Sequence, residues 1–281
     1  MFKHIILTRF NLRSPECSDY QNSGVTDEWM NHRMDLFERY YLSSLGAQTC
    51  KDFYVFVFFD GATKTKYKDK ITELQKNNSF FKPIYLGPKS DFLDVINMEI
   101  KKIVDSDTQY IITSRIDNDD AYHFRAIEYI QANFLPEDRY AINLTKGYRL
   151  VHGENKVLLK NSFTNGPFLS LIEKYDPGSK ITTVHCHVHH EFFLKYKIKQ
   201  IKKEYLWLQN IHGFNVSNDV CGFPLFSVDK LGRFGIKNNN IRLSFIKSFL
   251  QAFYYIFDIK NYVPLKLKYK IIEFKSRFVS E

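Results

Sequence analysis

The sequence of 281 residues lacks the features that define several protein classes. It has four cysteines, none of them in a Cys-x-x-Cys pair, so free cytosolic thiols are expected rather than a disulfide scaffold. No apolar run approaches about 18 residues, which predicts no transmembrane helix, and the N-terminal apolar run is too short for a signal peptide. Internal repeats and low-complexity tracts are also missing. We therefore expect a cytoplasmic globular protein, with the inner face of the cytoplasmic membrane as a further location.

Aromatic and basic residues are abundant instead. The chain holds 26 Phe, 18 Tyr and 2 Trp, and its 40 Lys and Arg against 31 Asp and Glu give a net charge of +9. Such a balance favours an anionic partner, which can be nucleic acid, a phosphorylated small molecule or an anionic membrane. Residues 241–281 carry eight Lys and Arg but only three Asp and Glu. The main body is therefore nearly balanced, which disfavours nucleic acid.

Strand and helix patterns alternate in the first half of the chain, which predicts a doubly wound α/β sheet. Strands are expected at 4–8, 53–59, 83–86 and 109–114, and helices at 29–45, 66–75 and 92–104. Further on, helical spacing covers 121–134 and 190–199, and antiparallel strands are expected at 141–144, 148–151 and 156–159. Because polar residues follow several of the strands, we expect a ligand crevice along their C-terminal ends.

An acidic segment, Asp117-Asn118-Asp119-Asp120, directly follows the last strand of the first half. Its three carboxylates repel one another, and burying them is costly unless a cation neutralises them. In an extended segment Asp117 and Asp119 project to one side, which suits Mg²⁺ or Mn²⁺ bound to a diphosphate. Arg115 could meet the same phosphates. The alternative is a solvated acidic turn that caps the next helix.

A histidine-rich segment, His185-Cys186-His187-Val188-His189-His190-Glu191, leads into a predicted helix. Zinc is not expected here, because the chain has no second ligand cluster with standard spacing. A carboxylate at a helix start stays ionised, so Glu191 is the candidate general base, and His190 could share or orient that role. The alternative is a set of half-buried histidines packed against aromatic rings.

A third segment, Trp207–Asn218, combines an aromatic ring, a histidine and several amides, which are the groups that sugar sites use. Trp207, His212 and Asn215 are therefore candidate residues for binding the acceptor or the sugar. His212 could also complete a metal shell with Asp117 and Asp119. The alternative places Trp207 in the core and His212 in a turn.

These segments, in this order, resemble the bacterial glycosyltransferase family described as "putative rhamnosyltransferase". The resemblance covers roughly residues 1–235, and two of its motifs are specific, SRIDNDDA and WLQNIHGFNVSN. The others are TRFN, the block WMNHRMDLFERYYLSSLGAQ, FFD and NLTKGY. The resemblance implies a GT-A-like (Rossmann-like), mostly parallel sheet flanked by helices over residues 1–240. It also implies a nucleotide-diphosphate sugar donor and a divalent cation, Mn²⁺ or Mg²⁺.

The resemblance also assigns roles to residues. The donor site would comprise Thr8, Arg9, Asn11, Asp60, Arg115 and Asp117. Asp117 and Asp119 match the metal-binding Asp-x-Asp, with Asp119 as the main ligand and Asp117 alternatively at the ribose. SLGAQT, followed by an aromatic strand and Asp60, is also similar to the start of the much larger class of inverting glycosyltransferases with the GT-A fold. Glu191 lies about where that class places its catalytic base. That class usually shows Glu-Asp there, whereas this chain has His-His-Glu.

The predicted reaction is metal-dependent, inverting transfer of a sugar, for which the family name suggests rhamnose, to a hydroxyl of a surface-glycan or lipid-linked glycan acceptor. The metal and Arg115 would stabilise the departing diphosphate, and Glu191 would take the hydroxyl proton. Two other classes stay open: a basic nucleic-acid-binding or nuclease-like protein, and a sugar-binding GT-A protein that has lost transfer activity.

The C-terminal extension, residues 241–281, has a pattern of its own. Ile246, Leu250, Phe253 and Phe257 recur at helical spacing, and beyond Pro264 apolar residues alternate with lysines. This combination predicts a peripheral anchor with aromatic rings in the membrane interface and lysines on anionic lipid. The alternative is a helix that packs on the catalytic domain or on a second subunit.

Overall fold

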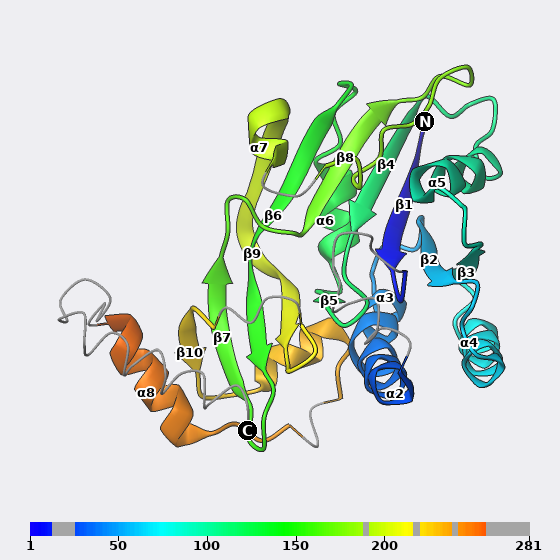
Figure 1. The fold of residues 1–281 in the computed structure, drawn as a ribbon. Coiled ribbons are helices and arrows are strands. Elements are labelled where there is room, and N and C mark those ends of the chain that lie inside the picture. Colours follow the sequence, from blue (N-terminus) through cyan, green and yellow to red (C-terminus); the bar gives the residue numbers. More distant parts are fainter. Residues whose placement is uncertain (13–25, 188–190, 216–219, 238–240, 257–281) are drawn as a thin grey trace.

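The structure, a computed structural model, describes residues 1–12, 26–187, 191–215, 220–237 and 241–256. Its centre is a ten-stranded mixed sheet with helices against it (Figure 1). Along the main path the strands follow the order β10-β7-β6-β8-β4-β1-β2-β3, and β9 joins through β6 and β5. The predicted fold class, a sheet with mostly parallel central strands flanked by helices, is confirmed.

Four parallel strands form one half of the sheet and follow the apolar runs of the sequence. They are β1 (Phe2–Arg9), β2 (Tyr54–Asp60), β3 (Phe81–Leu86) and β4 (Tyr110–Arg115). The middle residues of β1, β2 and β4 are buried whichever face they point to, as continuous apolar runs in a parallel sheet predict. Because these strands point the same way, the polar residues that follow β1, β2 and β4 meet at one edge of the sheet.

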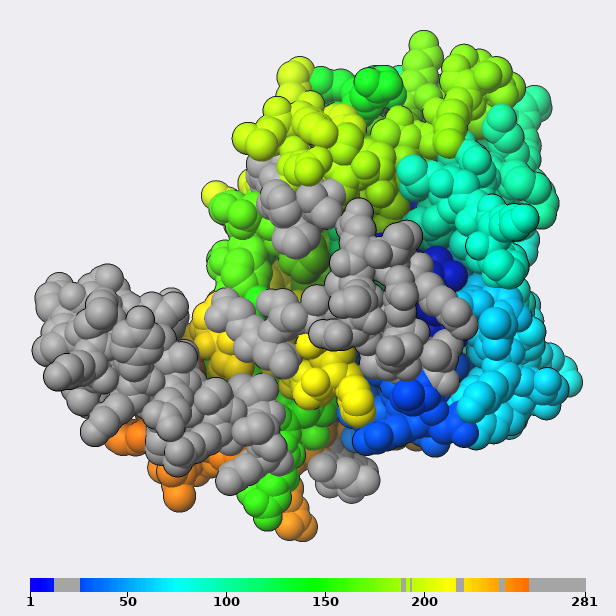
Figure 2. All heavy atoms as spheres, viewed as in Figure 1, coloured from blue at the N-terminus to red at the C-terminus, as the bar shows by residue number. Residues whose placement is uncertain are grey.

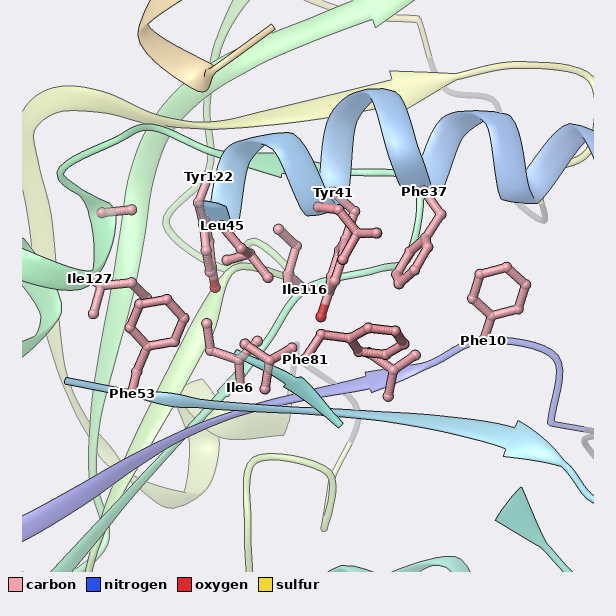
Figure 3. Packing of buried hydrophobic residues seen from close by; sticks show 14 of the residues in the cluster. Ile6, Phe10, Phe37, Tyr41, Leu45, Phe53, Phe81, Ile116, Tyr122 and Ile127 are labelled. Carbon is pink, nitrogen blue, oxygen red and sulfur yellow. The ribbon is translucent and has the colours of Figure 1, made fainter. Parts of the chain in front are cut away.

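Helices cover both faces of the parallel half. One face carries α2 (Asp27–Leu36), a π-helical turn (Phe37–Leu42), α3 (Ser43–Gly46), α4 (Thr65–Asn77) and α6 (Ala126–Ala132), and the other face carries α5 (Phe92–Lys101). Phe37, Tyr41 and Leu45 point from the first helical segment toward Ile6 and the sheet (Figure 3). This packing fixes α2 beside the edge where the strands end.

The other half of the sheet is mostly antiparallel. It contains β6 (Tyr140–Val151), β7 (Val157–Ser162), β8 (Leu169–Lys174) and β10 (Phe223–Leu225). β6 is one strand where two were expected. The helix predicted at 121–134 was also wrong in part, because the segment begins with β5 (Ala121–Tyr122), and α6 forms only after it.

A long strand, β9 (Lys197–Ile211), replaces much of the helix predicted at 190–199. The helix in this region, α7, covers only Phe192–Lys195. β9 then pairs in parallel with β6 along its length. At its start Lys197 and Lys199 are exposed while Ile198 and Gln200 are half-buried, a period of two that the helical expectation overlooked. The end of β9 delivers the His212 segment to the polar edge of the sheet.

The predicted C-terminal helix is present as α8 (Phe245–Ile256), preceded by a bridge between Leu243 and Lys156 beside β7. Residues 257–281, which include the alternating basic segment after Pro264, lie outside the described residues. Among the helices that the structure describes, none has the length and apolar character needed to cross a bilayer.

A buried polar ladder crosses three strands and gives a pH-dependent stability. His4 Nε2 lies 2.8 Å from Ser114 Oγ, which lies 2.5 Å from Ser170 Oγ. Burial lowers the pKa of His4 to about 3, so the folded state holds it neutral while the unfolded chain protonates it below about 6.5. The stability that His4 contributes is therefore complete above pH 6.5 and is lost as the pH falls toward 3.

We expect wild type to lose about 1.4 kcal/mol per pH unit relative to the His4→Gln variant between about pH 6 and 4. Urea unfolding of both proteins across this range measures the difference. Using a variant as reference removes the contributions of all other titrating groups. A stability difference that does not change with pH would contradict the assignment.

Candidate functional site

Hydrogen bonds connect polar residues of β1 and β2 to the loops that follow the strands, at one edge of the sheet. Thr8 Oγ1 lies 2.8 Å from Tyr41 Oη and donates to Ile116 O at 2.9 Å. Asn11 accepts from the Asp60 backbone N–H at 3.0 Å and donates to Thr63 Oγ1 at 3.0 Å. The structure therefore brings together three predicted donor-site residues.

Burial changes the role of two of them. Thr8 has no exposed surface and Asn11 is 2% exposed, and the polar groups of both side chains are already bonded inside the protein. The predicted direct contact with a nucleotide is therefore wrong for Thr8 and Asn11, which instead hold the strand ends in place. Asp60 is half-buried and its carboxylate accepts from Ala62 N at 2.8 Å, so it stays at the rim.

The three carboxylates of the acidic segment lie in three different environments. Asp117 is exposed, whereas Asp119 and Asp120 are 3% and 2% exposed. Asp120 Oδ1 accepts from the Asn210 backbone N–H at 2.9 Å. Burial, together with the nearby charges of Asp119 and Asp117, raises the pKa of Asp120 well above its usual range. The three carboxyl groups therefore differ in charge state, because that of Asp120 favours its neutral form.

Asp119 is held by two side chains from distant elements, in what we call the Arg33 cluster (Arg33, Asp119 and His212). Arg33 of α2 forms a buried ion pair with Asp119 Oδ2, and His212 Nε2 lies 2.8 Å from the same oxygen. Burial opposes ionisation of Asp119, but the charge of Arg33 and the hydrogen bond from His212 outweigh it, and the pKa lies below its usual value. Figure 2 shows α2 in blue beside the yellow atoms from the end of β9.

Asn118 connects the Arg33 cluster to the end of β1. Its amide nitrogen donates to the carbonyls of Arg9 and Phe10, both at 3.0 Å, and its oxygen accepts from Arg33 Nη1 at 3.3 Å. Neither Arg33 nor Asn118 was identified from the sequence. The signal for Arg33 was a basic residue between Met30 and Met34, on the apolar stripe of its helix, where a buried charge needs a partner.

A divalent cation does not fit the Arg33 cluster as it is arranged. Phe214 N donates to His212 Nδ1 at 3.3 Å, so Nε2 carries the proton that faces Asp119 and has no lone pair for a metal. Within the described ranges no three His, Cys, Asp or Glu side chains come together as a metal group. The cation that the buried carboxylate needs is supplied by Arg33 instead.

Two arginines form a separate basic group at the ends of β1 and β4. Arg9 is exposed, and Arg115 is half-buried, so that burial lowers its pKa while the charge of Asp117 opposes the shift. His185 lies against the same edge, with Nε2 3.3 Å from Leu7 O. Burial, with the charges of Arg115 and Arg9, lowers the pKa of His185 well below its usual value. In the described part of the chain, neither arginine forms an ion pair.

The predicted sugar platform is part of the core. Trp207 is fully buried, its Nε1 donates to Leu144 O at 2.7 Å, and its ring stacks on Phe168 with centroids 4.6 Å apart. Gly147, opposite it on β6, leaves room for the indole because a Cβ there would collide with the ring. Contact between Trp207 and a sugar was therefore a wrong prediction, and the core alternative is confirmed.

His212 and Asn215 form a turn. Asn215 Oδ1 accepts from His212 N at 2.9 Å, and its Nδ2 donates to Asn210 O at 3.1 Å. The turn fixes the imidazole against Asp119. A role of Asn215 in acceptor binding stays a prediction.

The predicted base lies elsewhere on the molecule. Glu191 precedes α7, forms an ion pair with Lys195 Nζ at 3.1 Å and lies 3.5 Å from His187 Nδ1. In Figure 1 α7 lies near the opposite end of the sheet from β5 and α2, so the structure does not bring Glu191 to the Arg33 cluster. His190 lies outside the described residues.

A comparison with protein families identifies the family of this chain. The family model described as "Putative rhamnosyl transferase" matches residues 3–223. The crystal structure of S. aureus TarS 1–349 is 15% identical, with a TM-score of 0.42, over 74% of this chain and 60% of that chain. Its complex with UDP is also 15% identical, with a TM-score of 0.42, over 75% of this chain and 61% of that chain. A "putative nucleotide-diphospho-sugar transferase" from Desulfovibrio desulfuricans G20 is 11% identical, with a TM-score of 0.33, over 75% of this chain and 82% of that chain. The chain spans about three fifths of the TarS fragment, and no curated protein matches it.

Proposed function

The chain belongs to the rhamnosyl transferase family and is a glycosyltransferase, and from this premise we propose that it binds a nucleotide-diphosphate sugar at the C-terminal ends of β1, β2 and β4. The observation that carries the proposal is the pair formed by Arg9 and Arg115, two cationic side chains without an ion-pair partner in the described chain. Two adjacent guanidinium groups repel one another, and an anion between them relieves that repulsion.

The donor's parts match the groups along the edge. The diphosphate lies at Arg9 and Arg115, where guanidinium groups donate paired hydrogen bonds to phosphate oxygens. Asp117, exposed and close in sequence to Arg115, accepts from ribose hydroxyls. Asp60, at the rim beyond β2, accepts from the base. This arrangement supports a donor-binding strip that runs across the ends of the parallel strands.

The arginines also have a part in the chemistry. As the bond between the sugar and the diphosphate breaks, negative charge grows on the leaving group, and fixed positive charges stabilise that change. The Arg33 cluster acts indirectly, by positioning Arg9. Asn118 links the cluster to the end of β1, because it accepts from Arg33 and donates to the backbone carbonyls of Arg9 and Phe10. We assign Asp119 and His212 this positioning role, which replaces the metal predicted from the sequence.

The finer features of the reaction follow the family resemblance. We propose inverting transfer, with rhamnose as the sugar, to a hydroxyl of a surface-glycan or lipid-linked glycan acceptor. We do not assign the removal of the acceptor's proton to Glu191, because Glu191 lies away from this donor-binding strip. The +9 charge supports a nucleic-acid-binding alternative only weakly, because most of it lies in residues 241–281.

A thermal-shift screen of UDP, GDP and dTDP sugars, each with EDTA and with Mn²⁺, tests the proposal. At a hundredfold excess over Kd, a bound ligand adds about 2.7 kcal/mol, which raises the Tm by about 5 °C or more for a chain of this size. We expect at least one nucleotide sugar to give this shift with EDTA present. A shift that requires Mn²⁺ would restore the metal prediction, and no shift with any donor would overturn the donor site.

A further inference from the structure

The C-terminal helix α8 has its apolar side turned outward. Phe245 and Ile246 are 71% and 72% exposed, and Phe249 and Leu250 are 58% and 41% exposed. A surface helix of a globular protein normally directs its apolar stripe toward the core and its polar residues toward water. The orientation of α8 is the reverse, and it leaves four large side chains in contact with solvent.

Over residues 245–252, the side of α8 that faces the protein carries polar residues. Ser248 is fully buried, and Gln251 Nε2 donates to Gly222 O at 3.4 Å. At the start of the helix Ser244 N donates to Lys156 O at 2.8 Å. The buried Ser248 and the hydrogen bond from Gln251 thus mark the side of the helix that faces the protein.

The apolar surface continues from α8 onto the segment after β10. Phe226 is 51% exposed, and its ring lies 5.4 Å from that of Phe245. Of the eleven large apolar side chains that are exposed in the described chain, six lie on α8 or within residues 223–226. We call this surface the α8 face (Phe226, Phe245, Ile246, Phe249 and Leu250). Contiguous patches of this kind mark interaction sites on otherwise soluble domains.

Positive charge lies beside and beyond the α8 face. Arg242 is exposed just before the helix, and Lys247 lies within it. The following residues, 257–281, contain six Lys and Arg against three Asp and Glu. Aromatic and aliphatic side chains flanked by basic residues are the composition of segments that lie in the interface of anionic bilayers.

We propose that the α8 face binds the surface of an anionic lipid bilayer, with α8 lying in the plane of the interface. Among the described helices none can span a bilayer, so the contact is peripheral. Charge favours lipid over a second copy of this chain, because two α8 faces brought together would also bring their basic segments together. In Figures 1 and 2 α8 (orange) lies at the margin of the molecule, away from α2, so a bilayer bound at α8 would lie apart from the donor edge.

Vesicle flotation of the full chain tests this inference. We expect binding to vesicles of phosphatidylcholine with about 30% phosphatidylglycerol, weak binding to phosphatidylcholine alone, and a loss of binding as salt is raised. The Phe245→Ser/Phe249→Ser variant should bind the anionic vesicles at least about tenfold more weakly. Met98→Ser is the matched control, because Met98 is also exposed, at 61%, but lies on α5. That control should bind like wild type.

The outcomes separate lipid from other partners. Equal vesicle binding by wild type and the double variant would overturn the inference, and so would no binding by wild type. A wild-type dimer that the double variant dissociates, measured by light scattering without lipid, would assign the face to self-association instead. Unchanged Tm of the double variant shows that it is folded. The donor-induced Tm shift is a separate readout, so failure of the membrane inference leaves the proposed function intact.

Discussion

Replacing Asp119 with asparagine should lower the free energy of unfolding by about 3–5 kcal/mol, because it leaves the buried Arg33 guanidinium without its counter-charge. Arg33 and Asp119 have side chains that are only 8% and 4% exposed, so water cannot replace the lost carboxylate. Transfer activity should fall at least about 100-fold, since the strand end that carries Arg9 depends on this cluster through Asn118. Urea unfolding and a single-turnover transfer assay measure the two effects.

A matched control lies on the same helical segment. Asp35 pairs with Arg39 at 3.1 Å, but these side chains are 56% and 48% exposed. Asp35→Asn should therefore change stability by less than about 1 kcal/mol and leave transfer unchanged. Equal effects of the Asp119 and Asp35 substitutions would contradict the role given to the buried pair.

The Arg33→Met variant distinguishes an arginine from a metal at this position. Alone it should destabilise the protein, because Asp119 is then a buried carboxylate without a cation, whereas combining it with Asp119→Asn should recover much of the lost stability. If Asp119 and His212 were metal ligands, Mn²⁺ would restore stability and activity to Arg33→Met. We expect Mn²⁺ to restore neither. Restored stability and activity would instead support a metal ion bound at Asp119.

Replacing Arg115 with methionine should weaken donor binding by about 2–3 kcal/mol, or about 30- to 150-fold, because hydrogen bonds to charged phosphate oxygens are lost. Methionine keeps an apolar stem at this half-buried position, so the fold should persist. Isothermal titration with the nucleotide sugar that gives the largest Tm shift measures the change.

Arg125→Met is the control for Arg115. Arg125 precedes α6 and pairs with Glu128 at 2.7 Å on the surface. Its removal subtracts the same charge from the protein but none from the donor edge, so donor affinity should stay within about twofold of wild type. An unchanged donor affinity in Arg115→Met would contradict the placement of the diphosphate at the ends of β1 and β4.

Much of the fold could be predicted from the sequence because local patterns and burial agree there. The run at 53–59 is apolar on both faces, and only a strand inside a parallel sheet buries it completely. The acidic segment at 117–120 was located correctly, since polar residues that follow a buried strand must emerge at the sheet edge. By contrast, the sequence predicts a helix over the start of β9, because a short apolar pattern fits a helix or a strand until a partner strand is known.

The candidate site depended on the packing of distant segments, which no local pattern contains. The sequence by itself determined that a buried carboxylate after β4 requires a cation, because an uncompensated buried charge is too costly. Only the tertiary structure decided which cation, because α2 packs against the strand ends and places Arg33, 86 positions away in the chain, on Asp119. In the same way the sequence determined that α8 is amphipathic, and the structure decided that its apolar side faces outward, because Ser248 and Gln251 occupy the side against the sheet.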